Sequence, residues 1–158
     1  MDSTFLNHFR QTTGLTAGEG ATSMTLSDGR VLWLFGQSHL NDYNTSLGMI
    51  ACNPNVHNAA LTMDAAFQVQ TLNTGLADFI PTNENGRWFT PLHGYQYVDT
   101  VFIFAKKMGG GANNRTYIAK YHFPDLQFLQ LDSFSYANTI YGYSIFTDSA
   151  RGFCYIYG

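Results

Sequence analysis

The chain has 158 residues, of which 45% are hydrophobic, 16% aromatic and only 12% charged. This length suits one domain. Soluble domains typically have about 25% charged residues, so the charged share of this chain is half the usual one. A net charge of −3, with eight scattered Lys and Arg residues, excludes a basic surface for nucleic acid. No apolar run approaches the ~20 residues of a membrane-spanning helix. We therefore expect a β protein kept soluble by Asn, Gln, Ser, Thr and Gly, with no nucleic acid as partner and no membrane span.

Several features depend on the cellular compartment. Residues 1–5 lack the basic and apolar regions of a signal peptide, so the protein is cytosolic or an export signal has been removed. Cys52 and Cys154 have no His or second Cys at zinc spacing. We expect both to be buried as small apolar residues, and a disulfide between them is the alternative. Asn44 and Asn114 begin glycosylation acceptor tripeptides, which matter only in a eukaryotic secreted protein.

Strand patterns dominate the chain, whereas Gly, Asn and Thr interrupt every candidate helical repeat. In chain order, the predicted strands are 21–26, 31–35, 58–63, 66–72, 95–98, 100–106, 117–123, 127–134, 143–147 and 153–157. The turn Ser27-Asp28-Gly29-Arg30 predicts a hairpin between the first two. The glycine-rich stretch 108–115 predicts an exposed hairpin end.

A weak internal repeat organises these strands. The three copies span 18–36, 92–105 and 140–158. Each copy has near its start a variable residue followed by Gly, continues with a strand and a turn, and closes with an aromatic-rich strand that ends in a small residue. Two further strands separate successive copies, so the unit is a sheet of four antiparallel strands, which is typical of a β-propeller. A β-sandwich is the alternative.

The predicted blades occupy about 15–75 and about 88–135, and a third begins at about 139–158. The chain then holds about two and a half blades, whereas propellers close with four to eight. We therefore expect further blades from missing sequence or from another copy of the chain.

These motifs resemble the N-terminal half of secreted five-bladed β-propellers related to glycoside hydrolases. The Leu-Trp-Leu-Phe-Gly-Gln-Ser sequence at 32–38 is similar to a Trp-Leu-Phe-Gly-Asp-Ser motif in their first blade, and 89–94 is similar to the turn that opens their second blade. The resemblance implies an extracellular or periplasmic protein. It also implies a central funnel, where carboxylates from successive blades act as nucleophile or base, stabiliser and acid.

The funnel positions implied by this resemblance are Glu19, His93 and Tyr141, and only Glu19 is a carboxylate. Gln37 stands where relatives often have Asp. Glycoside hydrolysis requires two carboxyl groups that face each other across the scissile bond. Unless an acid comes from missing sequence, the catalytic pair is incomplete, which disfavours an enzyme. Glu19 is the single catalytic candidate, and a solvent-facing loop acid is its alternative.

The candidate ligand-binding residues are Gln37, Asn58, Trp88, His93 and Tyr141. Trp88 follows a loop-like stretch and is a candidate platform for a sugar ring. His93 is either a donor to a ligand or a hydrogen-bonded turn histidine, and Asn58 either binds a ligand or satisfies a blade edge. His39 and His57 have no metal-ligand spacing, so we expect neither a metal nor another cofactor.

Two functions remain open from the sequence. The first is an extracellular, carbohydrate-recognising propeller that resembles glycoside hydrolases but lacks a complete carboxylate pair. The second is a structural extracellular β protein without catalytic activity, which assembles through exposed blade edges.

Overall fold

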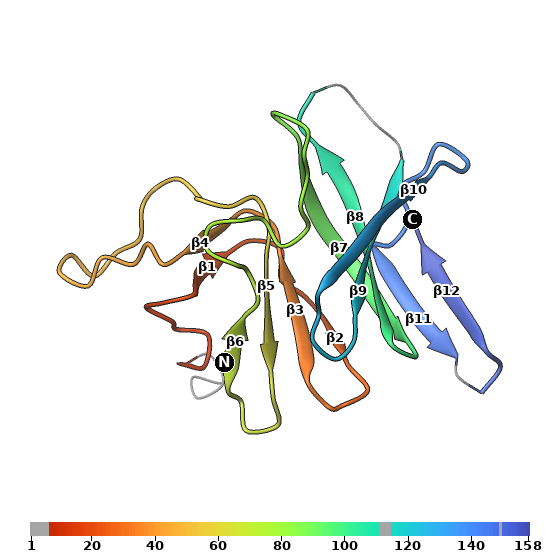
Figure 1. The fold of residues 1–158 in the computed structure, drawn as a ribbon, viewed down its shortest axis with the longest axis horizontal. Helices are drawn as coiled ribbons and strands as arrows, with labels where there is room; N and C mark the ends of the chain where they lie inside the picture. The colour runs from red at the N-terminus through yellow and green to blue at the C-terminus, as the bar shows by residue number, and fades with distance from the viewer. Residues whose placement is uncertain (1–6, 111–114, 149) are drawn as a thin grey trace. The chain divides into compact units, whose positions relative to one another are not determined.

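The computed structural model describes residues 7–110, 115–148 and 150–158. The chain forms two compact units, Met1–Pro81 (unit 1) and Thr82–Gly158 (unit 2), and each is described by itself. The named elements, β1 to β12, are strands, and their sheets are antiparallel (Figure 1). The prediction of an all-β protein is therefore confirmed.

Unit 1 contains a two-stranded and a four-stranded sheet. Its strands are β1 (Leu15–Gly18), β2 (Thr22–Thr25), β3 (Val31–Phe35), β4 (Ser38–Leu40), β5 (Ala59–Met63) and β6 (Val69–Thr71). β1 pairs with β4, and the larger sheet has the order β2-β3-β5-β6. All five residues of β5 are buried, as expected for a central strand of apolar side chains. This strand and β3 anchor a core with Leu15, Leu40 and Val56.

The predicted hairpin between β2 and β3 is confirmed. The backbone N–H of Leu26 donates to the carbonyl of Arg30 at 2.8 Å, which closes the turn. Gly29 has a φ of 88°, a conformation that favours glycine. The Asp28 carboxylate accepts a 2.7 Å hydrogen bond from the Arg30 guanidinium and fixes the turn from outside.

Unit 2 is a four-stranded sheet and a separate hairpin. Its strands are β7 (Trp88–Tyr97), β8 (Thr100–Met108), β9 (Thr116–His122), β10 (Phe128–Phe134), β11 (Ser144–Asp148) and β12 (Phe153–Tyr157). The larger sheet has the order β10-β9-β8-β7, so each strand pairs with its neighbour in sequence, and β11 pairs with β12. Buried side chains such as Phe89, Ile103, Phe104 and Tyr121 fill its interior.

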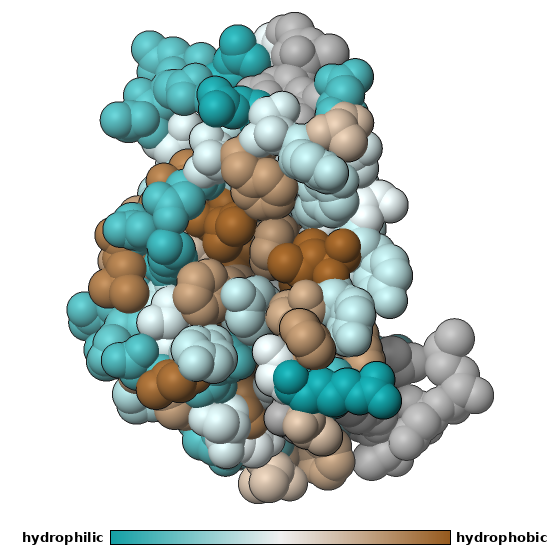
Figure 2. All heavy atoms as spheres, turned by 90° about the vertical axis from the view of Figure 1, so that its right-hand side faces the viewer, coloured by the Kyte–Doolittle hydropathy of each residue, from teal (hydrophilic) through white to brown (hydrophobic). Residues whose placement is uncertain are grey.

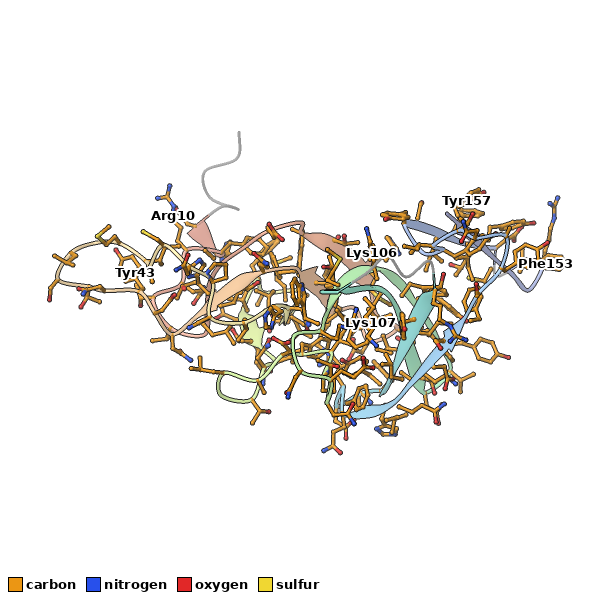
Figure 3. The ribbon with its side chains drawn as sticks, turned by 90° about the horizontal axis from the view of Figure 1, so that it is seen from above. Arg10, Tyr43, Lys106, Lys107, Phe153 and Tyr157 are labelled. Carbon is orange, nitrogen blue, oxygen red and sulfur yellow. The ribbon has the colours of Figure 1, made fainter. Side chains whose placement is uncertain are left out.

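The β11–β12 hairpin has no further strand among the described residues, whereas the two larger sheets have four each. Phe146, Phe153, Tyr155 and Tyr157 on this hairpin are between 41% and 60% exposed. Figure 2 faces this side of the molecule and shows apolar side chains among polar ones, and Figure 3 labels Phe153 and Tyr157 on β12. The outer edge of β12 is therefore an open strand edge lined by aromatic residues.

The structure differs most from the predicted strands at β1, β4 and β7. β1 and β4 were not predicted, because both are short and their paired residues lie 20 to 25 positions apart in the sequence. The predicted turn 89–94 belongs to β7, where a bulge between Pro91 and Gly94 interrupts the pairing with β8. Residues 111–114 of the predicted hairpin end lie outside the described residues.

The prediction that both cysteines are buried is wrong. Cys52 and Cys154 are exposed free thiols. Cys52 lies in the irregular segment between β4 and β5, and Cys154 lies on β12, whose outer edge nothing in the described chain covers. Asn44 is exposed and its side-chain oxygen accepts hydrogen bonds from the N–H groups of Ser46 and Leu47, while Asn114 lies outside the described residues. In the described part of the chain, no helix has the length and apolar character to cross a membrane.

Candidate functional site

The structure brings Glu19 and Gln37 together in unit 1. The N–H of Glu19 donates to the carbonyl of Gln37 at 3.1 Å, and the N–H of Gly36 donates to the carbonyl of Glu19 at 2.9 Å. A Cβ at Gly36 would lie 3.2 Å from Glu19 Cγ and Oε1, so this glycine leaves room for the carboxylate. Both side chains are exposed. They form a pair of polar groups that is open to a ligand.

The structure also brings His93 close to Tyr141, in unit 2. The N–H of His93 donates to the carbonyl of Gly142 at 2.8 Å, which joins the β7 bulge to the segment before β11. His93 Nδ1 accepts a 2.9 Å hydrogen bond from the N–H of Gly94. The N–H of Tyr141 donates to the buried hydroxyl of Thr116 at 2.8 Å. Hydrogen bonds from the backbone N–H groups of His93 and Tyr141 thus fix this part of unit 2.

Tyr141 belongs to a cluster of three aromatic rings. Its ring stacks on Phe134 at a centroid distance of 6.0 Å and meets Tyr136 at 6.2 Å. Tyr136 is 70% exposed, while Phe134 and Tyr141 are partly buried. The sequence analysis did not select Phe134 or Tyr136, although their spacing of two residues near the end of a predicted strand is a signal for a shared face. We call these three residues the tyrosine platform.

Asn58 and Trp88 lie elsewhere. Asn58 is fully buried, its Oδ1 accepts from the N–H of Ile80 at 2.6 Å, and its Nδ2 donates to the carbonyl of Ile80 at 3.3 Å. These contacts engage both the oxygen and the nitrogen of the Asn58 side-chain amide. Trp88 is the first residue of β7, is partly buried, and lies five residues before His93 on the same strand.

An ion pair joins β9 and β10 in unit 2. Lys120 Nζ lies 2.7 Å from Asp132 Oδ2. The hydrogen bond from Lys120 holds the pKa of the Asp132 carboxyl below its ordinary value, and Gln130 adds a second hydrogen bond. Asp132 is therefore an ionised acceptor at neutral pH. Its charge balances that of Lys120.

Unit 1 has a hydrogen-bonded cluster that the sequence analysis did not identify. His39 Nδ1 lies 2.6 Å from Asp42 Oδ2, and the Thr16 hydroxyl lies 2.8 Å from Asp42 Oδ1. Thr16 belongs to β1 and His39 to β4, so Asp42 joins the two strands. His39 and Asp42 are three residues apart, but only the pairing of β1 with β4 adds Thr16. In the ranges 7–110, 115–148 and 150–158, no three His, Cys, Asp or Glu residues form a group fit to hold a metal ion.

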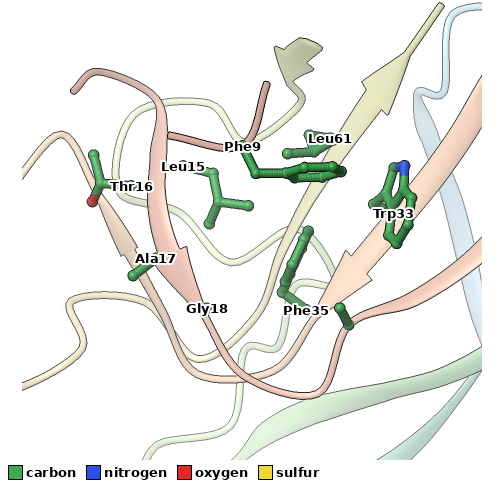
Figure 4. A pocket seen from close by; sticks show the side chains of 9 residues that line it. Phe9, Leu15, Thr16, Ala17, Gly18, Trp33, Phe35 and Leu61 are labelled. Carbon is green, nitrogen blue, oxygen red and sulfur yellow. The ribbon is translucent and has the colours of Figure 1, made fainter. Parts of the chain in front are cut away.

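Two hollows flank this region of unit 1. One has a volume of about 470 Å³ and is lined by Arg10, Gln11, Thr12, Thr16, Tyr43, Gly48, Met49 and Ile50. The other has a volume of about 330 Å³ and a mainly apolar lining that includes Leu15, Phe35 and Leu61 (Figure 4). The Phe9 ring meets the Trp33 ring edge-on there, at a centroid distance of 5.1 Å.

Comparisons with known proteins give one similar solved structure and one matching family model. A crystal structure of a candidate hydrolase from Bacteroides ovatus ATCC 8483 matches with a TM-score of 0.68 and 13% identity. The match covers 94% of this chain and 47% of the other, so the chain spans about half the length of that protein. At this identity the likeness shows the fold alone. A search of curated proteins gives no match. The model of one family matches residues 2–158, and the chain therefore belongs to this family, described as a domain of unknown function, DUF5005.

Proposed function

We propose that this chain is part of an extracellular or periplasmic β-propeller that recognises carbohydrate and lacks a complete catalytic carboxylate pair. Two consecutive sheets of four antiparallel strands and a further hairpin support a repeated blade architecture. The chain spans about half of the structure that it matches. Further blades then come from additional sequence or from another copy.

The tyrosine platform is the observation that carries the proposal. Tyr136 exposes a ring beside Tyr141, whose backbone N–H is fixed by Thr116. An aromatic ring offers an apolar face for the C–H groups of a sugar, and its phenol offers a hydrogen-bonding group for hydroxyls. A platform held by its backbone loses little entropy when a ligand binds.

Glu19 and Gln37 support recognition better than hydrolysis. The Glu19 carboxylate accepts hydrogen bonds, and the Gln37 amide both donates and accepts them, so the pair suits sugar hydroxyls. Gln37 cannot act as the second carboxyl group that glycoside hydrolysis requires. Glu19 and Gln37 by themselves therefore suit binding of a sugar and not its cleavage.

The experiment is a glycan-array screen, followed by calorimetry on the glycan that binds. Tyr141→Ala should weaken binding at least tenfold, about 1.4 kcal/mol, and Tyr141→Phe should retain most of it because the ring remains. Tyr157→Ala is the control, since this exposed tyrosine lies on β12. No binding across the array contradicts the function, and unchanged binding by Tyr141→Ala contradicts the placement of the site.

A second candidate function is favoured by the open edge of β12. This strand has the sequence Phe-Cys-Tyr-Ile-Tyr, without charge or proline. Natural edge strands usually carry charged residues or proline, because these residues oppose pairing with another chain. A structural, self-assembling protein would use this edge.

Light scattering tests the second candidate. Self-assembly predicts oligomers that Tyr155→Lys on β12 dissociates and that Tyr97→Lys, an exposed site at the end of β7, leaves intact. A monodisperse monomer over a wide concentration range contradicts it.

A further inference from the structure

Some of the polar side chains that line the 470 Å³ hollow in unit 1 have no ion pair or side-chain hydrogen bond to another described residue. Arg10 forms no ion pair within the described chain, and the phenol of Tyr43 forms no hydrogen bond there. Both residues line the hollow, with Thr12 beside them. We propose that this hollow binds a small hydroxylated carboxylate of the uronic acid class. The proposal rests on these residues alone, so the tyrosine platform can fail as a binding site without affecting it.

The charge of the hollow favours an anion. Among the described residues that line it, Arg10 alone carries a charge. Asp42 is hydrogen-bonded to Thr16 of that lining, and its carboxylate oxygens are engaged by His39 Nδ1 at 2.6 Å and by the Thr16 hydroxyl at 2.8 Å. The side chains of His39 and Asp42 are only 10% and 16% exposed. Arg10 is therefore left to bind a carboxylate, with which a guanidinium forms paired hydrogen bonds.

The other walls of the hollow suit a hydroxylated ring. Met49, Ile50 and the Tyr43 ring provide apolar surface. The hydroxyl of Thr12 and the phenol of Tyr43 can donate to and accept from ligand hydroxyls. The volume lies within the range of about 300–1,000 Å³ of small-molecule sites. Figure 3 labels Arg10 and Tyr43 at the same end of unit 1, with the Arg10 side chain pointing away from the ribbon.

The loop that supplies Tyr43 is held in place before any ligand arrives. The N–H of Asn44 donates to the carbonyl of Met49 at 2.8 Å, and the N–H of Gly48 donates to the carbonyl of Asn44 at 2.8 Å. Asn55 clamps Leu40 through two side-chain hydrogen bonds of 2.8 Å, where β4 ends. A preformed wall reduces the ordering cost of binding.

Calorimetry at low ionic strength tests the proposal with three probes. D-galacturonate should bind, whereas D-galactose, which lacks the carboxylate, and acetate, which lacks the ring, should bind at least tenfold more weakly. Affinity for galacturonate should fall as salt rises, because the interaction is ionic. Absence of galacturonate binding overturns the proposal, and so does equal binding of acetate or of galactose.

Variants locate the site. Arg10→Gln should weaken galacturonate binding at least tenfold, and Tyr43→Phe should weaken it by a smaller factor. Arg151→Gln is the matched control, because this arginine is 75% exposed in unit 2. Arg10 is an exposed residue, so an unchanged melting temperature should accompany the loss of binding. Tyr141→Ala should keep full galacturonate affinity at this site, which separates it from the tyrosine platform. Unchanged affinity in Arg10→Gln overturns the assignment.

Discussion

His93 is joined to Gly142 by a backbone hydrogen bond of 2.8 Å, across 49 positions of sequence. The bond connects the bulge of β7 to the residue that leads into β11 through Tyr143. Gly142 is buried and has a φ of 104°. The chain can make this approach only because position 142 has no side chain.

Gly142→Ala should therefore destabilise unit 2 strongly. The new Cβ would lie 2.2 Å from Phe104 Cβ, a clash with a buried side chain, and the backbone conformation adds strain of about 1–2 kcal/mol. Gly20→Ala is the control, since Gly20 also has a positive φ but has open space where the new Cβ would lie. Urea unfolding of both variants checks this. Equal losses would mean that Phe104 moves aside at no cost.

Thr116→Val should loosen the segment that contains Tyr141. The buried hydroxyl accepts the Tyr141 N–H, and its loss leaves that donor unsatisfied at a cost of about 1–3 kcal/mol. Thr147→Val, at an exposed site on β11, should change stability by less than about 0.5 kcal/mol. Denaturant titration gives both values, and NMR linewidths of Tyr141 report the loosening. A stable Thr116→Val protein with a rigid Tyr141 would contradict the role of this bond.

Asn58→Ala should destabilise unit 1 without altering ligand binding elsewhere. Its amide pairs with both backbone groups of Ile80, so truncation leaves two buried groups without their partner, at about 1–3 kcal/mol each. Asn53→Ala, in an exposed loop, is the neutral comparison. Thermal unfolding measures the difference. If Asn58→Ala instead keeps full stability and loses glycan binding, the ligand-binding prediction for Asn58 is the correct one.

The pKa of Asp132 should rise when Lys120 is replaced by Met. The hydrogen bond from Lys120 lowers the pKa of this carboxyl below its ordinary value of 3.8. A lowered folded-state pKa stabilises the protein above about pH 3.8, and this contribution is lost as the pH falls through the folded-state pKa. Carboxyl carbon NMR titration measures the change. Lys106→Met, on β8, should leave the pKa of Asp132 unchanged.

Local sequence signals predicted the hairpin strands well. Val31–Phe35 and Phe153–Tyr157 match their predicted ranges to the residue, because each is a continuous apolar and aromatic run bounded by a Gly-containing turn. The turn expected at Phe89–Gly94, which includes Pro91 and Gly94, comes from the resemblance to the second-blade turn of the propeller family. The β-bulge accommodates both within β7, a tertiary feature that local patterns do not reveal.

The candidate sites were only partly predictable. The sequence selected Tyr141, but its hydrogen-bond partner Thr116 lies 25 residues away on another strand. Likewise, the cluster of Thr16, His39 and Asp42 depends on the pairing of two short strands that were not predicted. Contacts of this kind arise from sheet register, which a single sequence specifies only through its hydrophobic pattern.

The uncovered hairpin sets a gradient of local stability in unit 2. Amide protons exchange with solvent through local opening, whose free energy is small where few apolar side chains are buried. β11 and β12 expose most of their side chains, whereas β8 lies between two strands and buries Val101, Ile103, Phe104 and Ala105. Deuterium should therefore enter β11 and β12 first and β8 last, so the hairpin opens while the larger sheet stays folded.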